Sequence, residues 1–278
     1  MENKMKYEIV ASDLDGTLLG EDQIVSAENL AAISEMNRLG VKFVPTTGRS
    51  LGEIPKELKE SADVRYIITS DGAAIWDKEL GDMMITHYIP RDLVKFIIEV
   101  ENSCTSYSIA HVSGKTYYDA KRHTPENLDA CRLDGYFRKL IAERTEPISD
   151  YDGLLSSSDT VEMIVIFFES DAELERARRL LLESGRLGIS QTAPNNLEIY
   201  LSSAGKGRSL KALADKIGVD ISAVIAVGDS LNDTELVKTA SLGLAMENAH
   251  AALKEIADKV ICHVSEHSAK YILDNFLF

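Results

Sequence analysis

Cysteine is scarce in this 278-residue sequence, and long apolar runs are missing. The three cysteines, Cys104, Cys131 and Cys262, are odd in number and far apart, which fits neither a disulfide framework nor a zinc motif. No segment approaches the length needed to cross a bilayer, and residues 1–6 lack an apolar secretory core. We therefore expect a cytoplasmic protein that has no membrane-spanning helix.

Positive charge is also in short supply. The 30 Lys and Arg residues are outnumbered by 45 Asp and Glu residues, for a formal net charge of -15. A field of this sign repels a phosphate backbone unless a local basic patch overcomes it, so we expect no nucleic-acid partner. A small phosphorylated ligand would need cations, metal ions or backbone N–H groups at its binding site.

The remaining composition is that of an ordinary globular protein, and roughly 150 residues per domain would give one large domain or two modest ones. Apolar strand-like runs alternate with helix-like stretches near both ends of the chain. This alternation predicts parallel βαβ units and an α/β fold with a doubly wound, Rossmann-like sheet. The expected strands cover residues 9–11, 41–47, 66–69, 223–227, 242–246 and 260–261.

The middle of the chain, residues 84–194, has a different pattern and is expected to form an inserted α+β domain. It contains a hairpin-like pair of strands that flank a turn at residues 113–115. The core domain would then be formed by residues 1–83 and 195–278. The elements expected in the insertion are helices near residues 93–100 and 171–185 and strands at 107–112, 116–118 and 161–168.

Two carboxylates, Asp13 and Asp15, follow the first expected strand. In an open α/β sheet the ligand lies beyond the carboxyl ends of the strands, so both side chains are expected in that crevice. Their two-residue spacing suits a nucleophile and a general acid and base that act on one small volume. Taken alone, the pair is also compatible with an ordinary turn rich in Asp and Gly.

A second acidic loop, from Gly228 to Asp233, follows another apolar strand. Magnesium takes oxygen ligands, often one or two carboxylates with water and phosphate oxygens. Asp229 is therefore expected to share a metal ion with Asp13. For this loop by itself, an N-cap that satisfies free helix N–H groups is the alternative.

Two further segments offer groups that bind phosphate. A hydroxyl at Thr47 and the backbone at Gly48 can approach phosphate oxygens closely. Lys206, between Gly205 and Gly207, could neutralise a phosphoryl group at the start of a helix. Taken alone, the first segment is more often a plain strand-to-helix turn, and a lysine such as Lys206 is more often a surface residue. All four segments, however, fall at corresponding ends of expected strands or helices and together contain what phosphoryl transfer needs.

The segments DLDGTLL, TTGR, GKG and GDSLND resemble motifs one to four of the haloacid dehalogenase-like hydrolases. The stretch from Met246 to Asp258 resembles the segment after motif four in the Cof-type subfamily, and the insertion matches that subfamily's class IIB cap in position and length. The resemblance implies a magnesium-dependent phosphatase of small phosphate monoesters, with sugar phosphates as the leading class. Phosphorylated cofactors such as pyridoxal phosphate and nucleotide monophosphates follow. Without coiled-coil heptads, a monomer or small homo-oligomer is expected.

The resemblance also implies a role for each site residue. Asp13 would attack phosphorus and form an aspartyl-phosphate, while Asp15 would protonate the leaving alcohol and later activate water. Asp13, Asp229 and the backbone carbonyl of Asp15 would hold magnesium. The other expected roles are phosphate binding by Thr47, Gly48, Lys206 and Asn232, orientation of Lys206 or a metal-bound water by Asp233, and substrate contact by Arg49.

Two segments depart from the subfamily pattern. Asp71-Gly72-Ala73 stands where Asn-Gly-Ala is usual, which adds a carboxylate near the site, and residues 260–268 lack the Asp-Gly pair often found there. The inserted cap would close over the site and supply substrate contacts. Its candidate contacts are Arg122, His123 and Arg132, although such side chains are commonly exposed to solvent.

Two other functions are compatible with the same motifs. A sugar phosphomutase of the same superfamily would need a cap that grips a second phosphate, and the insertion has no clear arginine cluster. A non-catalytic phospho-acceptor or ligand-binding module, like a receiver domain, would need neither Asp15 as acid and base nor a large insertion. Hydrolysis is therefore the expected activity.

Overall fold

The computed structural model describes residues 6–20 and 22–277, apart from the side chain of Tyr136. We expected the first six residues to lack a secretory core, and residues 1–5 of this segment lie outside the described residues. The chain divides into two compact units. Unit 1 contains Met1–Gly48, Ile54–Thr86 and Gly205–Phe278, and unit 2 contains Arg49–Glu53 and His87–Ala204.

The sequence-based assignment of a catalytic core and a cap stays a prediction about the roles of these units. The observed boundaries of the units differ from the predicted ones in three places. Residues 49–53 and 195–204 belong to unit 2 and not to unit 1, and residues 84–86 belong to unit 1.

Unit 1 is built on a parallel sheet of five strands in the order β14-β13-β12-β1-β2. The central strand β1 pairs in register with both neighbours, so Ala11 lies opposite Ala226 and Val44. All residues of β1 are buried, as expected for a parallel strand covered on both faces. The strands are β1 (Ile9–Ser12), β2 (Lys42–Pro45), β12 (Val224–Gly228), β13 (Leu242–Ala245) and β14 (Lys259–Val260).

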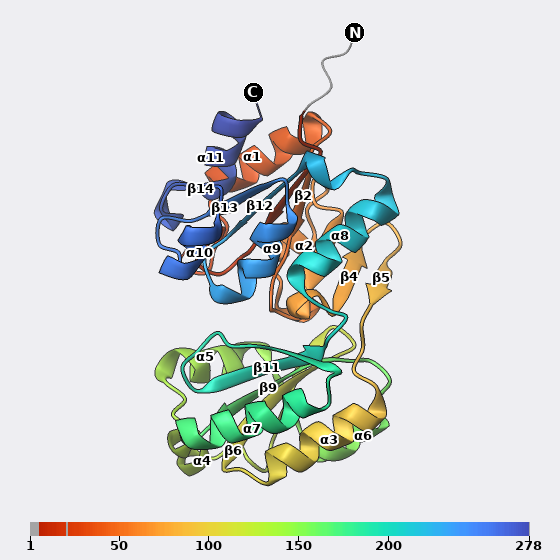
Figure 1. The fold of residues 1–278 in the computed structure, drawn as a ribbon, viewed down its shortest axis with the longest axis vertical. Helices are drawn as coiled ribbons and strands as arrows, with labels where there is room; N and C mark the ends of the chain where they lie inside the picture. Colours follow the sequence, from red (N-terminus) through yellow and green to blue (C-terminus); the bar gives the residue numbers. More distant parts are fainter. Residues whose placement is uncertain (1–5, 21, 278) are drawn as a thin grey trace. The chain divides into compact units, whose positions relative to one another are not determined.

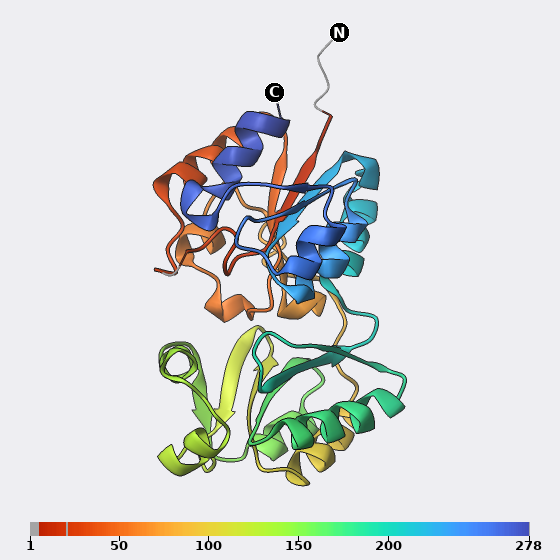
Figure 2. The same cartoon turned by 60° about the vertical axis from the view of Figure 1, so that its left-hand side comes forward.

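Helices cover both faces of this sheet, with α1 and α11 on one face and α8, α9 and α10 on the other (Figures 1 and 2). The Ser26 hydroxyl oxygen accepts from the Asn29 N–H at 3.2 Å and caps α1. Gly218 ends α8 with a φ of 75°. The helices of unit 1 are α1 (Ala27–Arg38), α2 (Lys56–Lys59), α8 (Lys206–Ile217), α9 (Thr234–Thr239), α10 (Ala251–Ile256), α11 (Ser268–Phe276) and the short 3-10 turns η2 (Ser70–Gly72), η3 (Ile221–Ala223), η4 (Leu231–Asp233) and η5 (Val264–Glu266).

The strand expected at residues 66–69 is present, and it runs parallel to the end of β2 at one bridge, between Thr46 and Ile68. It is β3 (Tyr66–Thr69), and it pairs antiparallel with β4 (Ala74–Asp77), which in turn pairs with β5 (Asp82–Thr86). The chain reverses because the three residues of η2 all have positive φ angles. A single bridge between Thr46 and Ile68 connects β3 to the end of β2, so the η2 turn is held beside that strand end.

Unit 2 contains a sheet of six strands in the order β10-β11-β9-β6-β7-β8, antiparallel except between β7 and β8. The predicted hairpin is confirmed as β6 and β7, with Ser113 and Gly114 at positive φ in the turn. The strands are β6 (Ser106–Val112), β7 (Lys115–Asp119), β8 (Glu146–Ile148), β9 (Val161–Phe168), β10 (Leu187–Ser190) and β11 (Asn196–Leu201).

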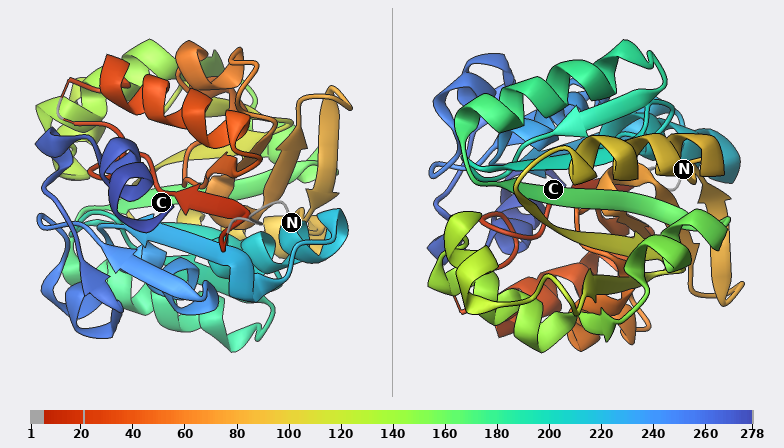
Figure 3. Two further views of the ribbon diagram at one scale, coloured as in Figure 1. Left: turned by 90° about the horizontal axis from the view of Figure 1, so that it is seen from above. Right: turned by 90° about the horizontal axis from the view of Figure 1, so that it is seen from below.

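Side chains of the unit 2 sheet alternate between two apolar cores. Ile164 and Ile166 pack with α3, α6 and α7, whereas Val165 and Phe167 pack with α4 and α5. The yellow α3 and green α7 lie side by side in Figure 3. The helices are α3 (Arg91–Asn102), α4 (Pro125–Ala130), α5 (Gly135–Arg144), α6 (Tyr151–Ser157), α7 (Asp171–Glu183) and the 3-10 turn η1 (Leu51–Glu53).

The fold class predicted from the sequence, a parallel α/β core interrupted by an α+β unit, is confirmed. Among the described helices of both units, none combines the length and the apolar character needed to span a bilayer.

Candidate active site

The carboxyl end of β1 carries the first pair of acidic residues. The Asp13 N–H donates to the Val227 carbonyl at 3.0 Å, which fixes Asp13 beside β12. The chain then turns at Asp15, because the Thr17 N–H donates back to the Leu14 carbonyl. Asp13 is buried and Asp15 is half-buried. The proposed nucleophile and the proposed acid and base therefore share one tight turn.

Gly16 makes room in this turn for the second acidic loop. Its φ is 77°, and a Cβ on this residue would overlap the Asp229 carboxylate. The Thr17 hydroxyl donates to Asp229 Oδ1 at 3.4 Å. Asp229 follows β12, which is the neighbour of β1 in the sheet, so the two acidic loops meet at adjacent strand ends.

Lys206 is the first residue of α8 and is only 2% exposed. Its Nζ donates to Asp13 Oδ1 at 2.8 Å and to Asp233 Oδ1 at 2.7 Å. Asp233 Oδ2 accepts from the backbone N–H groups of Asp229 and Ser230, each at 3.1 Å. Both oxygens of Asp233 are thus engaged, and Asp233 fixes Lys206 against Asp13.

The site holds more negative than positive charge. Burial raises the pKa of Asp13 well above its usual range, and repulsion from Asp233 adds to the rise. Burial and then repulsion from Asp233 raise the pKa of Asp229 to about 6. Burial disfavours the charged form of Lys206, but Asp13 and Asp233 outweigh it and raise the Lys206 pKa. Lys206 therefore remains a cation among carboxylates.

This donor set fits a hard divalent cation. Oxygen atoms of Asp13, Asp229 and Asp233 lie within 4.8 Å of one another, and carboxylate oxygens are the ligands that Mg²⁺ prefers. A cation would offset the repulsion that raises the pKa of Asp13 and Asp229. Since both oxygens of Asp233 already accept hydrogen bonds, Asp13 and Asp229 are the better candidates for metal ligands.

The predicted phosphate-binding residues Thr47 and Asn232 are both tied to the η2 turn. The Thr47 N–H donates to the Ile68 carbonyl at 2.9 Å, and the Thr47 carbonyl accepts from the Asp71 N–H at 3.1 Å. Asn232 Nδ2 donates to Asp71 Oδ1 at 3.3 Å. The sequence analysis noted Asp71 only because Asn is usual at this position of the subfamily. The Asp-Gly pair directly after a buried strand was the sequence signal that could have placed Asp71 in the site.

Asn248 is a second supporting residue to which the sequence gave no role. Its Nδ2 donates to the Gly16 carbonyl at 2.8 Å, and its Oδ1 accepts from the Val264 N–H at 3.0 Å. The His250 N–H also donates to the Asp229 carbonyl at 2.8 Å. The stretch from Met246 onward therefore supports both acidic loops.

The other candidate substrate contacts belong to unit 2. Arg49 is 9% exposed, and its Nη1 donates to a backbone carbonyl four residues later at 3.3 Å. His123 Nδ1 lies 2.8 Å from the Tyr107 hydroxyl. Arg132 pairs with Asp171 at 2.9 Å. Each of these three side chains is engaged within unit 2.

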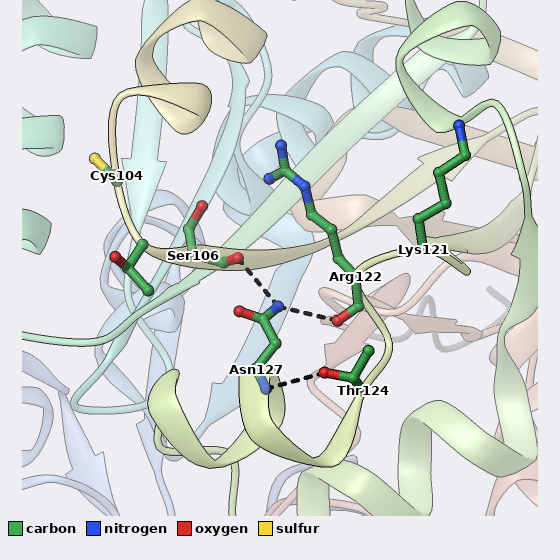
Figure 4. Close-up of a pocket in the computed structure, with 7 residues that line it drawn as sticks. Cys104, Ser106, Lys121, Arg122, Thr124 and Asn127 are labelled. Atoms are coloured by element: carbon green, nitrogen blue, oxygen red, sulfur yellow. Dashed lines mark hydrogen bonds between the residues drawn. The ribbon is translucent and has the colours of Figure 1, made fainter.

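Arg122 lines a cavity of about 330 Å³ in unit 2 (Figure 4). Its Nη1 donates to Glu101 Oε1 at 2.8 Å, so the guanidinium is paired with a carboxylate of the same unit. Asn127 forms part of the wall and donates to the Arg122 carbonyl at 3.0 Å. The cavity is lined by Cys104, Thr105, Ser106, Lys121, Arg122, Thr124 and Asn127.

The parallel sheet, its acidic strand ends and the buried lysine agree with the four motifs that resemble those of the haloacid dehalogenase-like hydrolases. The sequence model of the haloacid dehalogenase-like hydrolases matches residues 10–273. The chain belongs to this family, so the resemblance carried by the four motifs is confirmed, as is its assignment as an enzyme.

Relatives and solved structures agree with this assignment over nearly the whole chain. A 5-amino-6-(5-phospho-D-ribitylamino)uracil phosphatase of Bacillus subtilis is 29% identical over 255 residues, covering 91% of this chain and 88% of the relative. An HMP-PP phosphatase of Yersinia pseudotuberculosis is 27% identical, with 90% and 87% covered. A haloacid dehalogenase-like hydrolase from B. subtilis superimposes with a TM-score of 0.83 at 28% identity, covering 97% of this chain and 100% of that structure. A HAD subclass IIB sugar phosphatase has the same fold, with a TM-score of 0.82, 18% identity and coverage of 98% and 100%.

Proposed function

We propose that this chain is a magnesium-dependent phosphatase that hydrolyses small phosphate monoesters through an aspartyl-phosphate on Asp13. The observation that carries the proposal is the buried Lys206 Nζ between Asp13 Oδ1 and Asp233 Oδ1, at 2.8 and 2.7 Å. A fixed cation beside a carboxylate nucleophile favours the charge that develops on a transferring phosphoryl group. Relatives named as phosphatases support hydrolysis over a phosphomutase reaction.

The two carboxylates at the end of β1 would have different roles, with Asp13 as the nucleophile and Asp15 as the general acid and base. An oxygen of Asp13 attacks phosphorus, the bond from phosphorus to the leaving oxygen breaks, and Asp15 gives its proton to that oxygen. Asp15 then takes a proton from water, the water oxygen attacks phosphorus, and the bond to Asp13 breaks. The products are the free alcohol and inorganic phosphate.

The remaining residues hold charges in place. Magnesium, when bound, would neutralise phosphoryl charge and polarise a phosphoryl oxygen; Asp13, Asp229 and the carbonyl of Asp15 would hold it. Asp233 keeps Lys206 directed at Asp13 through its two hydrogen-bonded oxygens. The phosphoryl oxygens would be held by Thr47, Gly48, Lys206 and Asn232.

Sugar phosphates are the leading substrate class. The name of the B. subtilis relative specifies a phosphorylated ribityl group, and one solved structure of the same fold is a sugar phosphatase. The HMP-PP phosphatase relative supports phosphorylated cofactors as the second class. We assign substrate selection to unit 2, with Arg49 as a substrate contact. The cysteines are all free, in keeping with the cytoplasm as the site of action.

The proposal is tested by measuring phosphate release from a panel of sugar phosphates and a generic aryl phosphate, with and without Mg²⁺. Native protein is compared with the Asp13→Asn variant. We expect metal-dependent release that is lost in the variant, together with a phosphoryl group trapped on Asp13 of the native protein. Release that persists in the variant would contradict the role of Asp13.

A further inference from the structure

One carboxylate oxygen of Asp71 lies next to three of the residues that we propose to bind phosphate. Its Oδ1 accepts from Asn232 Nδ2 at 3.3 Å and lies 4.0 Å from Lys206 Nζ. A Cβ placed on Gly48 would lie 3.2 Å from the same oxygen. The side chain of Asp71 is almost fully buried. A single oxygen atom is therefore next to the phosphate loop, the lysine and the asparagine.

The backbone that carries Asp71 is held in an uncommon conformation. Ser70 and Asp71 have φ angles of 51° and 50°, a region that side chains with a Cβ seldom occupy and that persists where the surroundings enforce it. Here the Asp71 N–H donates to the Thr47 carbonyl at 3.1 Å, and the Ser209 hydroxyl donates to the Gly72 carbonyl at 2.6 Å. The turn is thus fixed on both sides, and so is the position of the carboxylate.

A fixed negative charge at this place acts against a phosphate anion. Lys206 already faces Asp13 and Asp233 at hydrogen-bonding distance, and Asp71 is the third carboxylate near its ammonium. A phosphoryl group held by Lys206 and Asn232 would lie within a few bond lengths of Asp71, where like charges repel strongly because little water screens them. The Asp71 carboxylate therefore lowers the affinity of the phosphate-binding groups for an anion.

We propose that Asp71 is a positioning residue that orients Asn232 and, through its charge, weakens the retention of inorganic phosphate so that the product leaves readily. This inference rests on the proposed function. It names inorganic phosphate as the ligand whose affinity Asp71 sets, and it assigns Asp71 no contact with the reacting atoms.

Two substitutions separate the charge of Asp71 from its hydrogen bond. Asp71→Asn keeps the size, an acceptor oxygen for Asn232 and a side chain that tolerates positive φ, but it removes the charge. Asp71→Ala removes both. Asp215→Asn is the matched control, because it removes one negative charge from the exposed surface of α8, where Asp215 pairs with Lys211 at 3.0 Å.

The affinity for inorganic phosphate is measured by calorimetry in the presence of Mg²⁺ and as the inhibition constant against substrate. We expect Asp71→Asn to bind phosphate about tenfold more tightly than native protein, with a lower KM. Asp71→Ala should also bind phosphate more tightly but should lose kcat, because Asn232 is no longer oriented. Asp215→Asn should match native protein in phosphate affinity, in the inhibition constant, in KM and in kcat.

Phosphate affinity that is equal to or weaker than native in Asp71→Asn would overturn the inference, as would the absence of measurable phosphate binding in both proteins. Failure of the proposed function looks different, since native protein would then release phosphate from no compound in the panel. Thermal unfolding of each variant establishes that it is folded, and the calorimetric comparison does not depend on turnover.

Discussion

Lys206 Nζ lies 2.7 Å from Asp233 Oδ1, and both side chains are almost completely buried. A lysine at the first position of a helix faces the positive end of the helix dipole, which opposes its charge. The carboxylates around it reverse that effect and keep the ammonium charged. Because Asp233 is itself fixed by two backbone N–H groups, the loop after β12 determines where Lys206 presents its charge to Asp13.

Substitution of Lys206 by Met should remove this cation while keeping most of the side-chain volume. Asp13 and Asp233 then lose their shared partner in a buried site, so we expect the free energy of unfolding to fall by about 3–5 kcal/mol at pH 8, with loss of phosphate release. At pH 5 the loss should be smaller, because burial and the repulsion from Asp233 raise the pKa of Asp13, and a protonated Asp13 no longer carries a charge. Urea unfolding at both pH values measures this difference. Lys211→Met, which removes an exposed lysine of the same helix, should change stability little at either pH, and an equal loss at both pH values in Lys206→Met would argue against the charge-based explanation.

Asp15→Asn should separate the two halves of the reaction. The variant keeps Asp13 but lacks a general acid and base, so kcat should fall by about 10²–10⁴. With an aryl phosphate, whose leaving group needs little protonation, we expect a rapid burst of about one equivalent of phenol per enzyme. The phosphorylated Asp13 should then persist and be detectable by mass spectrometry. Unchanged turnover would remove the acid and base role and favour a phospho-acceptor module.

Gly16→Ala should damage the metal site through a direct steric effect. The new Cβ would press on the Asp229 carboxylate, so we expect Mg²⁺ affinity to fall by about tenfold or more. Gly40→Ala is the matched control, since Gly40 has a similar φ of 81° but nothing within 4 Å of an added Cβ. Both variants should lose about 1–2 kcal/mol of stability from the backbone conformation. Calorimetric titration with Mg²⁺ distinguishes them, and equal affinities would show that Asp229 is not displaced.

Local sequence patterns predict much of the frame that holds the site. The cap of α1 at Ser26, the glycine after α8 at position 218 and the burial of β1 all depend on residues close in sequence, where capping and periodicity operate. The same holds for Asp13 and Asp229, because a residue that follows a parallel strand is placed by that strand. These elements could therefore be predicted before any contact was known.

Contacts between distant segments could not be predicted in this way. Asn248 bonds the carbonyl of Gly16, and Asn232 bonds Asp71, across 232 and 161 positions of the chain. Such pairs depend on the order of strands in the sheet and on the reversal of the chain at η2, which two non-glycine residues at positive φ produce. The antiparallel strands β4 and β5, which follow this reversal, were therefore not predicted, whereas β3 is parallel to the end of β2 as expected.

Glu101 in α3 should make the stability of the protein depend on pH. Its Oε1 accepts from Arg122 Nη1 at 2.8 Å in an almost fully buried position. Burial raises the pKa of Glu101 from 4.5 to about 7; Arg122 opposes the rise, and Asp152 and Asp119 add to it. A carboxyl group whose pKa is raised on folding stabilises the folded state below its unfolded pKa, and this contribution is lost as the pH rises through the folded pKa. The Glu101 contribution should therefore decline by about 3 kcal/mol as the pH rises from about 4.5 to above 7.

Glu101→Gln isolates this contribution, because the variant retains the shape of the side chain and cannot titrate. We expect the free energy of unfolding of the variant, relative to native protein, to improve by about 3 kcal/mol between pH 4.5 and pH 8. Urea unfolding at several pH values measures the difference, and groups that titrate elsewhere cancel because both proteins contain them. Glu99→Gln, on the exposed side of the same helix, should show no such trend. A difference between Glu101→Gln and native protein that stays constant with pH would mean that Glu101 is ionised throughout, and that its pairing with Arg122 outweighs the effect of burial.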